Sequence, residues 1–285
     1  MKKSTILFYL PVLFFSAVLL YLLVWNVYYS FTDWSILNRI PKVVGLSTYS
    51  QIFSDTRFRT AVIHSFELSG VLVLAGNALG ILIAGLLYAV KNSKLRITYM
   101  SLFIYPLTIS MSANGLIFLW LFNPEYGINW LLSKLHLPTY TWFAATSTEL
   151  PSLILIIIWA YTGIAMLFYL ASFINVDKSI VEAARMDGAG FFRIFARILV
   201  PNSLNGLIVS TALLFLFSFR VFSLPFVISG NASDIYYQTL LTYQYYKFAS
   251  SYFAQSAAAS TIVVVIALAI VVPYAMLGMK RWSHH

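Results

Sequence analysis

The chain has 285 residues, 60% of them hydrophobic and 9% charged, with a mean hydropathy of +0.83 and a net charge of +9. A soluble domain usually carries about 25% charged residues, so this composition excludes a soluble globule and indicates an integral membrane protein. The lack of cysteine excludes disulfides, thiolate metal sites and cysteine nucleophiles, and basic cytoplasmic loops explain the positive charge better than nucleic-acid binding does.

Six apolar segments are long enough to cross a bilayer core of about 30 Å, which requires roughly 20 helical residues. The first segment is longer than a signal-peptide core and has no small-residue cleavage site, so we expect it to be a retained helix. The sequence therefore predicts an all-α integral membrane protein with a single domain over residues 1–285. Its six transmembrane helices are expected at about 6–31, 63–90, 97–122, 151–174, 203–229 and 257–279.

The distribution of lysine and arginine predicts the orientation of these helices, because basic residues collect in cytoplasmic loops. With the N-terminus inside, the cytoplasmic segments hold 11 basic residues, the outer loops hold 6, and Arg220 lies within the fifth span. We therefore expect both termini in the cytoplasm. An ionisable residue inside a membrane is costly, so Arg220 is either functional or held by a structural pair or by snorkelling.

The sequence lacks the motifs of several other functions. It has no GxxxxGK[ST] phosphate loop, no HExxH and no GxSxG, and its four histidines lack the spacing of metal ligands. We therefore expect no catalytic residues, no metal and no ATP site on this chain. Gly76 and Gly80 form a GxxxG pair in the second span, a pattern that lets membrane helices approach closely.

The segment between the fourth and fifth spans, VEAARMDGAGFFRIFARILVPNSL at 181–204, concentrates charge, alanine and glycine. Ser179 as N-cap and Glu182 three residues later fit a capping box, and Gly188 suits a left-handed helix end. We expect a helix over 180–187, too short to be stable alone in water and so docked in a groove of another protein. The contact residues would be Glu182, Ala183, Ala184, Arg185, Asp187 and Gly188. The alternative is an ordinary solvated loop.

A second short helix is expected from about Phe191. Phe191, Phe195 and Ile198 fall on one face, whereas Arg193 and Arg197 are spaced to lie on another, at the lipid headgroups. Pro201 would then end this interfacial helix and begin the next span.

The spacing of Glu182-Ala183-Ala184, Gly188, Ile198 and Pro201 resembles the EAA loop of permease subunits of binding-protein-dependent ABC importers. The chain is similar over nearly all its length to the maltose-type, F-like sugar permeases. The supporting segments are LFNPEYGINWLL at 121–132, the sequence at 159–184, FLFSFRVFSLPFVISG at 215–230 and YFAQSAAAS at 252–260. Two departures are Ser229-Gly230-Asn231-Ala232, where relatives often have Gly-Gly-Pro, and Ser223, near which relatives often have an acidic residue.

The resemblance implies a type I ABC importer permease of the cell membrane, with a cytoplasmic coupling loop at 175–202. It implies as partners a second permease of similar fold, two ABC ATPase subunits that bind ATP and magnesium, an extracytoplasmic solute-binding protein and membrane lipid. The expected cargo is a sugar, either a mono- or disaccharide, with glucose possible. Glycerol phosphate, a polyamine or an amino acid stay open as cargo, and so does an ion-coupled secondary transporter.

Residues for the substrate pathway follow from their position on the spans before and after the EAA loop in such relatives. Sugar sites combine aromatic faces with a few polar groups, although aromatic residues here could equally contact lipid or neighbouring helices. The predicted residues are Tyr161, Thr162, Phe217, Ser218 and Val221, with Arg220 and Asn77 as polar neighbours.

Overall fold

The computed structural model describes residues 3–143 and 147–282, so residues 1–2, 144–146 and 283–285 of the predicted single domain lie outside it. Every regular element in the described ranges is a helix, which confirms the all-α class. The elements are α1 (Lys3–Ser30), α2 (Ser47–Ser54), α3 (Thr56–Ala89), α4 (Ser93–Thr108), α5 (Met111–Leu121), α6 (Gly127–Lys134), α7 (Glu149–Ile174), α8 (Lys178–Met186), α9 (Phe191–Ile194), the π-helix η1 (Phe195–Leu199), α10 (Val200–Asn202), α11 (Leu204–Phe219), α12 (Ser223–Ser229), α13 (Leu240–Ala249) and α14 (Phe253–Trp282).

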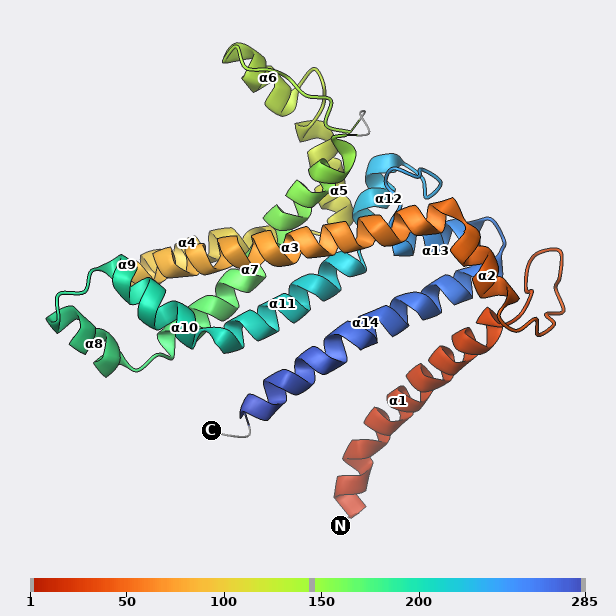
Figure 1. Cartoon of the computed structure of the whole chain (residues 1–285), viewed down its shortest axis with the longest axis horizontal. Coiled ribbons are helices and arrows are strands. Elements are labelled where there is room, and N and C mark those ends of the chain that lie inside the picture. Colours follow the sequence, from red (N-terminus) through yellow and green to blue (C-terminus); the bar gives the residue numbers. More distant parts are fainter. Residues whose placement is uncertain (1–2, 144–146, 283–285) are drawn as a thin grey trace.

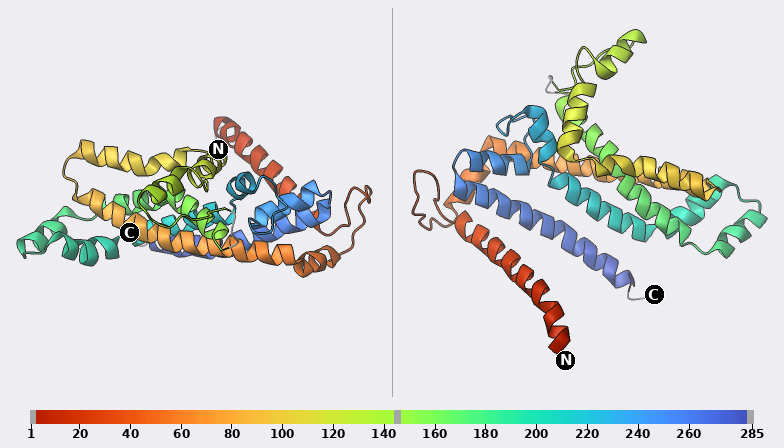
Figure 2. Two further views of the ribbon diagram at one scale, coloured as in Figure 1. Left: turned by 90° about the horizontal axis from the view of Figure 1, so that it is seen from above. Right: turned by 180° about the vertical axis from the view of Figure 1, so that it is seen from behind.

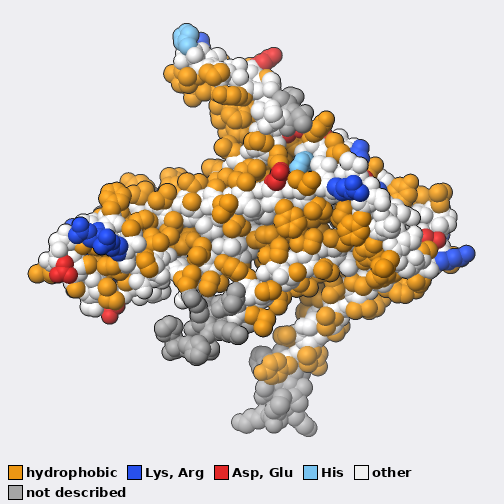
Figure 3. Space-filling view, in the orientation of Figure 1, with side chains coloured by type: hydrophobic (Ala, Val, Ile, Leu, Met, Phe, Trp, Pro, Cys, Tyr) orange, Lys and Arg blue, Asp and Glu red, His pale blue; other side chains and the backbone are white. Residues whose placement is uncertain are grey.

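Five helical segments are long and apolar enough to span a membrane, and α4 with α5 makes a sixth if the bent pair is one span. The five are Tyr9–Ser30, Thr56–Ala89, Glu149–Ile174, Leu204–Ser229 and Phe253–Tyr274. Hydrophobic side chains cover most of the face seen in Figure 3, and groups of Lys and Arg lie towards its two ends. This distribution fits a body whose middle lies in the bilayer.

The third predicted span differs from the structure. Instead of one helix over 97–122, α4 and α5 meet at a bend of 97°. Ile109 and Ser110 are extended, and the Ser110 side chain accepts a hydrogen bond from the Ala113 amide to start the second helix. Hydropathy does not predict such a bend, because it is the same in a straight and a broken helix; the local signals are Pro106 and the capping residue Ser110.

The core lies between α3, α7 and α11. Buried residues of all three helices form one cluster, and a second cluster joins the start of α3 to α11, α13 and α14. In contrast, α1 leaves the body, as Figures 1 and 2 show, and packs mainly against the first half of α14. Asn26 anchors that contact by donating to the Ala257 carbonyl and the Thr261 hydroxyl at 3.2 and 3.1 Å.

Glycine lets the core helices approach closely, which confirms the prediction for Gly76 and Gly80. A Cβ atom at Gly80 would lie 2.5 Å from the Ala165 Cβ and 2.9 Å from a backbone nitrogen of α7. A Cβ atom at Gly76 would lie 3.0 Å from the Leu214 side chain on α11. The pair therefore faces both partner helices of α3.

At the end of the body that carries α2, an ion pair fixes α13 to the start of α3. The Lys247 ammonium lies 2.8 Å from Asp55, and the Tyr243 hydroxyl donates to the same carboxylate at 3.0 Å. Burial raises the pKa of Asp55, but the hydrogen bonds from Lys247, the Arg57 amide and Tyr243 outweigh it and hold that pKa below its ordinary value.

Candidate functional site

The short helix predicted over 180–187 is present as α8, which spans Lys178–Met186, with one correction at its start. Asp177, rather than Ser179, is the N-cap, because its carboxylate accepts the Ser179 amide at 2.9 Å. Hydrogen bonds from the Ser179 amide and side chain lower the pKa of Asp177. Both residues are good caps, so the sequence did not decide between them. Gly188 ends the helix with φ of +77°, the left-handed conformation that was predicted for it.

The side chains of α8 are almost entirely open. Val181 is the one buried side chain of the helix, and Ala184 is half-buried. The other predicted contact residues are exposed: Glu182, Ala183, Arg185, Asp187 and Gly188. Within residues 3–143 and 147–282 none of these charges has an ion-pair partner. Figure 1 places α8 at the tip of the molecule, opposite α2, where a partner protein can reach it.

The segment after α8 attaches this tip to the core. Ile194 and Leu199 are buried, and the Phe195 ring packs on Gly85 of α3 and lies 5.9 Å from the Phe173 ring of α7. The helix does not stop at Pro201 as predicted. It continues through η1 and α10 and ends at Asn202, one residue after Pro201, and α11 begins at Leu204. We call residues 191–202 the elbow.

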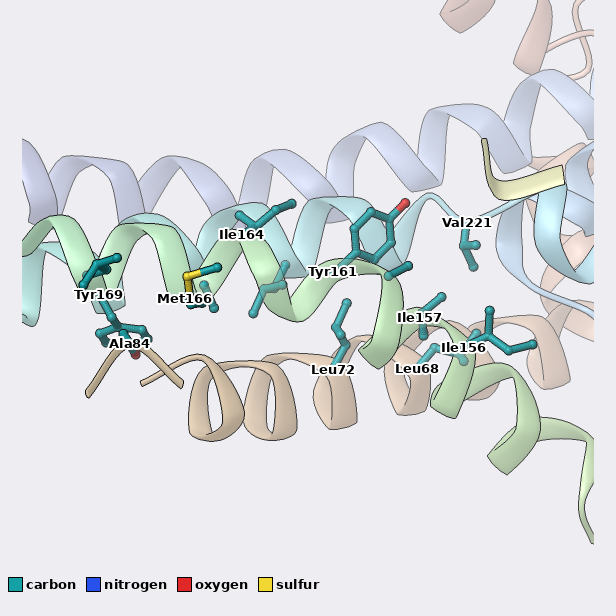
Figure 4. Close-up of a cluster of buried hydrophobic side chains, with 14 of the residues drawn as sticks. Leu68, Leu72, Ala84, Ile156, Ile157, Tyr161, Ile164, Met166, Tyr169 and Val221 are labelled. Atoms are coloured by element: carbon teal, nitrogen blue, oxygen red, sulfur yellow. The ribbon is translucent and has the colours of Figure 1, made fainter. Parts of the chain in front are cut away.

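Four of the predicted substrate-pathway residues lie close together. The Tyr161 ring of α7 stacks on Phe217 of α11, with centroids 5.1 Å apart and an interplanar angle of 14°. Arg220 is exposed where α11 ends, three residues after Phe217. Figure 4 shows Val221 beside this region. The stacked pair and the exposed Arg220 thus lie on either side of the end of α11, where the chain breaks before α12.

The break itself is held by a polar contact. The Val221 carbonyl accepts a hydrogen bond from the Thr239 hydroxyl at 2.9 Å, so a chain end that α11 leaves open is satisfied from outside the helix. By contrast, the Thr162 and Ser218 hydroxyls are buried and donate to carbonyls of their own helices at 2.7 and 2.8 Å.

Asn77 lies in a separate polar cluster. Its Oδ1 accepts hydrogen bonds from Tyr169 and Ser210 at 3.0 and 2.5 Å, and its Nδ2 donates to the Val73 carbonyl and the Thr211 hydroxyl at 2.7 and 3.1 Å. All four hydrogen-bonding positions of the amide are therefore used within the chain. We call Asn77, Tyr169, Ser210 and Thr211 the Asn77 cluster. It joins α3, α7 and α11 inside the membrane.

Comparison with known proteins decides the family. Residues 76–279 match the model of the binding-protein-dependent transport system inner membrane component. The chain belongs to this permease family. The permease is 53% identical to the glucose import system permease protein GlcT of Saccharolobus solfataricus, over 99% of each chain. It is 28% identical to the xylose/arabinose import permease protein XacH of Haloferax volcanii, over 90% of this chain and 82% of that protein.

A solved structure supports the fold of the permease. A chain of a bacterial alginate ABC transporter, in complex with an alginate pentasaccharide-bound periplasmic protein, matches with a TM-score of 0.84 at 21% identity. The match covers 98% of the permease and 96% of that chain. The predicted ABC importer fold and the multi-pass membrane location are therefore confirmed.

The permease also has features that sequence reasoning missed. Tyr169, Ser210 and Thr211 were not singled out, although polar side chains within apolar spans are the signal for helix-to-helix hydrogen bonds. Among the described residues no group of three or more His, Cys, Asp or Glu could hold a metal ion. The arrangement offers a stacked aromatic pair at a break in a span, and exposed charge on α8.

Proposed function

We propose that this permease is a transmembrane subunit of an ATP-driven importer that carries a monosaccharide into the cytoplasm, with glucose as the leading candidate. The observation that carries the proposal is the 53% identity to GlcT over 99% of each chain, because GlcT is named as a glucose import permease. Similarity to XacH, named for xylose and arabinose, supports a monosaccharide class.

The open surface of α8 supports docking on an ATPase subunit. Glu182, Arg185 and Asp187 are exposed and lack ion-pair partners among the described residues, so they can form charge-assisted hydrogen bonds across an interface. ATP and magnesium would be bound by two ATPase subunits. A second permease chain and an extracytoplasmic binding protein would complete the importer.

The packing beneath α8 supports rigid-body coupling. The elbow is seated on α3 and α7 through Phe195, and the Asn77 cluster ties these helices to α11. A displacement of α8 by an ATPase subunit would therefore move the three helices together. Those helices carry Tyr161 and Phe217, so the motion would reach the substrate region and alternate its access between the two sides.

The stacked pair Tyr161 and Phe217 suits a sugar. Aromatic faces cover the apolar side of a pyranose ring, while Arg220 can donate hydrogen bonds to hydroxyl groups. The broken helix at this position supports the assignment, because transporter substrate sites often lie where membrane helices are interrupted.

The importer test uses the permease together with its second permease, ATPase subunits and binding protein, reconstituted in vesicles. We expect ATP-dependent uptake of radiolabelled glucose that excess unlabelled xylose reduces and glycerol 3-phosphate or spermidine leaves unchanged. Uptake driven by an ion gradient with a hydrolysis-deficient ATPase would refute ATP coupling. Uptake of glycerol 3-phosphate or spermidine in place of glucose would refute the cargo class.

The pathway test compares two aromatic residues in spans. Tyr161→Ala should reduce glucose uptake at least tenfold while the complex assembles normally, because it removes one stacked face. Tyr99→Ala, on the exposed side of α4, is the matched control and should leave uptake within about twofold of wild type. Equal uptake by the two variants would reject the placement.

A further inference from the structure

An apolar groove of about 210 Å³ lies between α3 and the elbow, near the end of the body that carries α8. It is lined by Leu82, Gly85, Leu86, Phe191, Phe192 and Phe195. Several of these side chains face outward: Phe192 is 82% exposed, Leu86 65% and Leu82 54%. Within a membrane-spanning helix such a surface faces lipid or protein rather than water.

The groove is built into the fold. Phe195 lies against Gly85, where any side chain would occupy the place of its ring, and Phe191 stacks on Phe195 with centroids 6.1 Å apart. Ile194 and Leu199 are buried on the other side of the elbow. One wall is therefore fixed by packing before any ligand arrives.

Positive charge is concentrated in the chain segments next to those that line the groove. Lys91 and Lys94 are exposed just beyond the end of α3, and Arg193 and Arg197 are exposed on the elbow. Residues 82–96 and 189–202 contain no Asp or Glu, and none of the four cations is ion-paired within the described residues. Figure 3 shows Lys and Arg side chains gathered at this end of the molecule, next to hydrophobic ones.

We propose that this groove binds an anionic phospholipid of the cytoplasmic leaflet. One acyl chain would lie along Leu82, Leu86 and Phe192, and the phosphate group would lie between Arg193 and Arg197. Guanidinium groups bind phosphate oxygens in pairs, and basic sites at the cytoplasmic ends of membrane helices favour anionic lipid. A zwitterionic lipid would satisfy the apolar wall but would leave the positive charge without a net counter-charge.

The position of the groove gives the lipid a role beyond solvation. The elbow connects α8 to the core, so a lipid that bridges α3 and the elbow stabilises the mounting of the coupling helix. We therefore expect the lipid composition of the cytoplasmic leaflet to affect how strongly ATP hydrolysis drives transport. This inference goes beyond the proposed sugar import and does not depend on the cargo.

The test measures lipid retained by the purified, complete importer. The complex is extracted from vesicles of equal phosphatidylglycerol and phosphatidylcholine with matched chains, and bound lipid is counted by native mass spectrometry. Each basic residue near an anionic lipid contributes roughly a fivefold preference, so Arg193→Gln with Arg197→Gln should lower the phosphatidylglycerol preference about 25-fold. Arg193→Lys with Arg197→Lys should restore most of it.

Two further variants separate the groove from general charge. Phe192→Ala should lower retention of both lipids together and leave their ratio unchanged, because it removes the wall and keeps the charges. Lys134→Gln, an exposed cation at the end of α6, should change neither. An unchanged ratio in the double glutamine variant would overturn the proposal. Loss of the ATPase subunits from that variant, with lipid retention unchanged, would instead make the elbow a protein interface.

Discussion

Asn77→Leu tests whether the Asn77 cluster holds the core helices together. Leucine has a similar volume but removes every hydrogen bond of the amide, including three to other helices: Tyr169 at 3.0 Å, Ser210 at 2.5 Å and Thr211 at 3.1 Å. Hydrogen bonds between membrane helices average about 0.6 kcal/mol each, so their loss should cost about 2 kcal/mol.

The loss of stability should exceed the sum over the three hydrogen bonds, because the buried Tyr169 hydroxyl also loses its acceptor on Asn77. The unpaired hydroxyl adds about 1–2 kcal/mol. We therefore expect the free energy of unfolding to fall by about 3–4 kcal/mol. Tyr169→Phe in the Asn77→Leu background should restore part of this, because it removes the unpaired hydroxyl. The two single variants and the double variant form a cycle, with an expected coupling energy of about 1 kcal/mol.

The assay is unfolding of the purified importer by sodium dodecyl sulfate titrated into mild detergent micelles. Ser101→Ala is the matched control, since that exposed hydroxyl of α4 donates only to the Ile97 carbonyl of its own helix. We expect it to change stability by less than about 0.5 kcal/mol. If Asn77→Leu behaves like Ser101→Ala, or if the cycle gives no coupling, the cluster does not hold α3, α7 and α11 together.

Three further predictions address local structure. Gly188→Ala should weaken substrate-stimulated ATP hydrolysis and destabilise the end of α8 by about 1–2 kcal/mol, because its φ is +77°; Gly190→Ala, at φ of −70° with open space around it, should not. Gly80→Leu should lower the free energy of unfolding by about 1–3 kcal/mol, because the larger side chain pushes α3 away from α7; the measurement is the amount of folded complex. Gly70→Leu, where a Cβ atom meets nothing within 4 Å, should leave that amount unchanged. The lowered pKa of Asp55 stabilises the protein above its unfolded pKa near 4, and this contribution is lost as pH falls through the folded pKa. Asp55→Asn should therefore lower the melting temperature at pH 7 and flatten its acid dependence; a parallel curve would contradict this.

Local chemistry explains where sequence reasoning succeeded. The membrane class follows from composition, and apolar length predicts where helices can cross the bilayer. The end of α8 was predictable because a left-handed residue after a short helix favours glycine, whatever surrounds it. The start of α8 was not, since Asp177 and Ser179 can both cap a helix and the choice depends on how the chain leaves α7.

The sequence by itself determined the membrane class, the helical content, the small-residue stripe at Gly76 and Gly80, and the short helix that ends at Gly188, because each depends on neighbouring residues. The tertiary structure decided the 97° bend between α4 and α5, the stacking of Tyr161 on Phe217, and the three partners of Asn77 on other helices. These features join residues up to 134 positions apart. In a bilayer a polar group pairs with whichever partner the packing of helices brings within reach, and no local pattern specifies that partner.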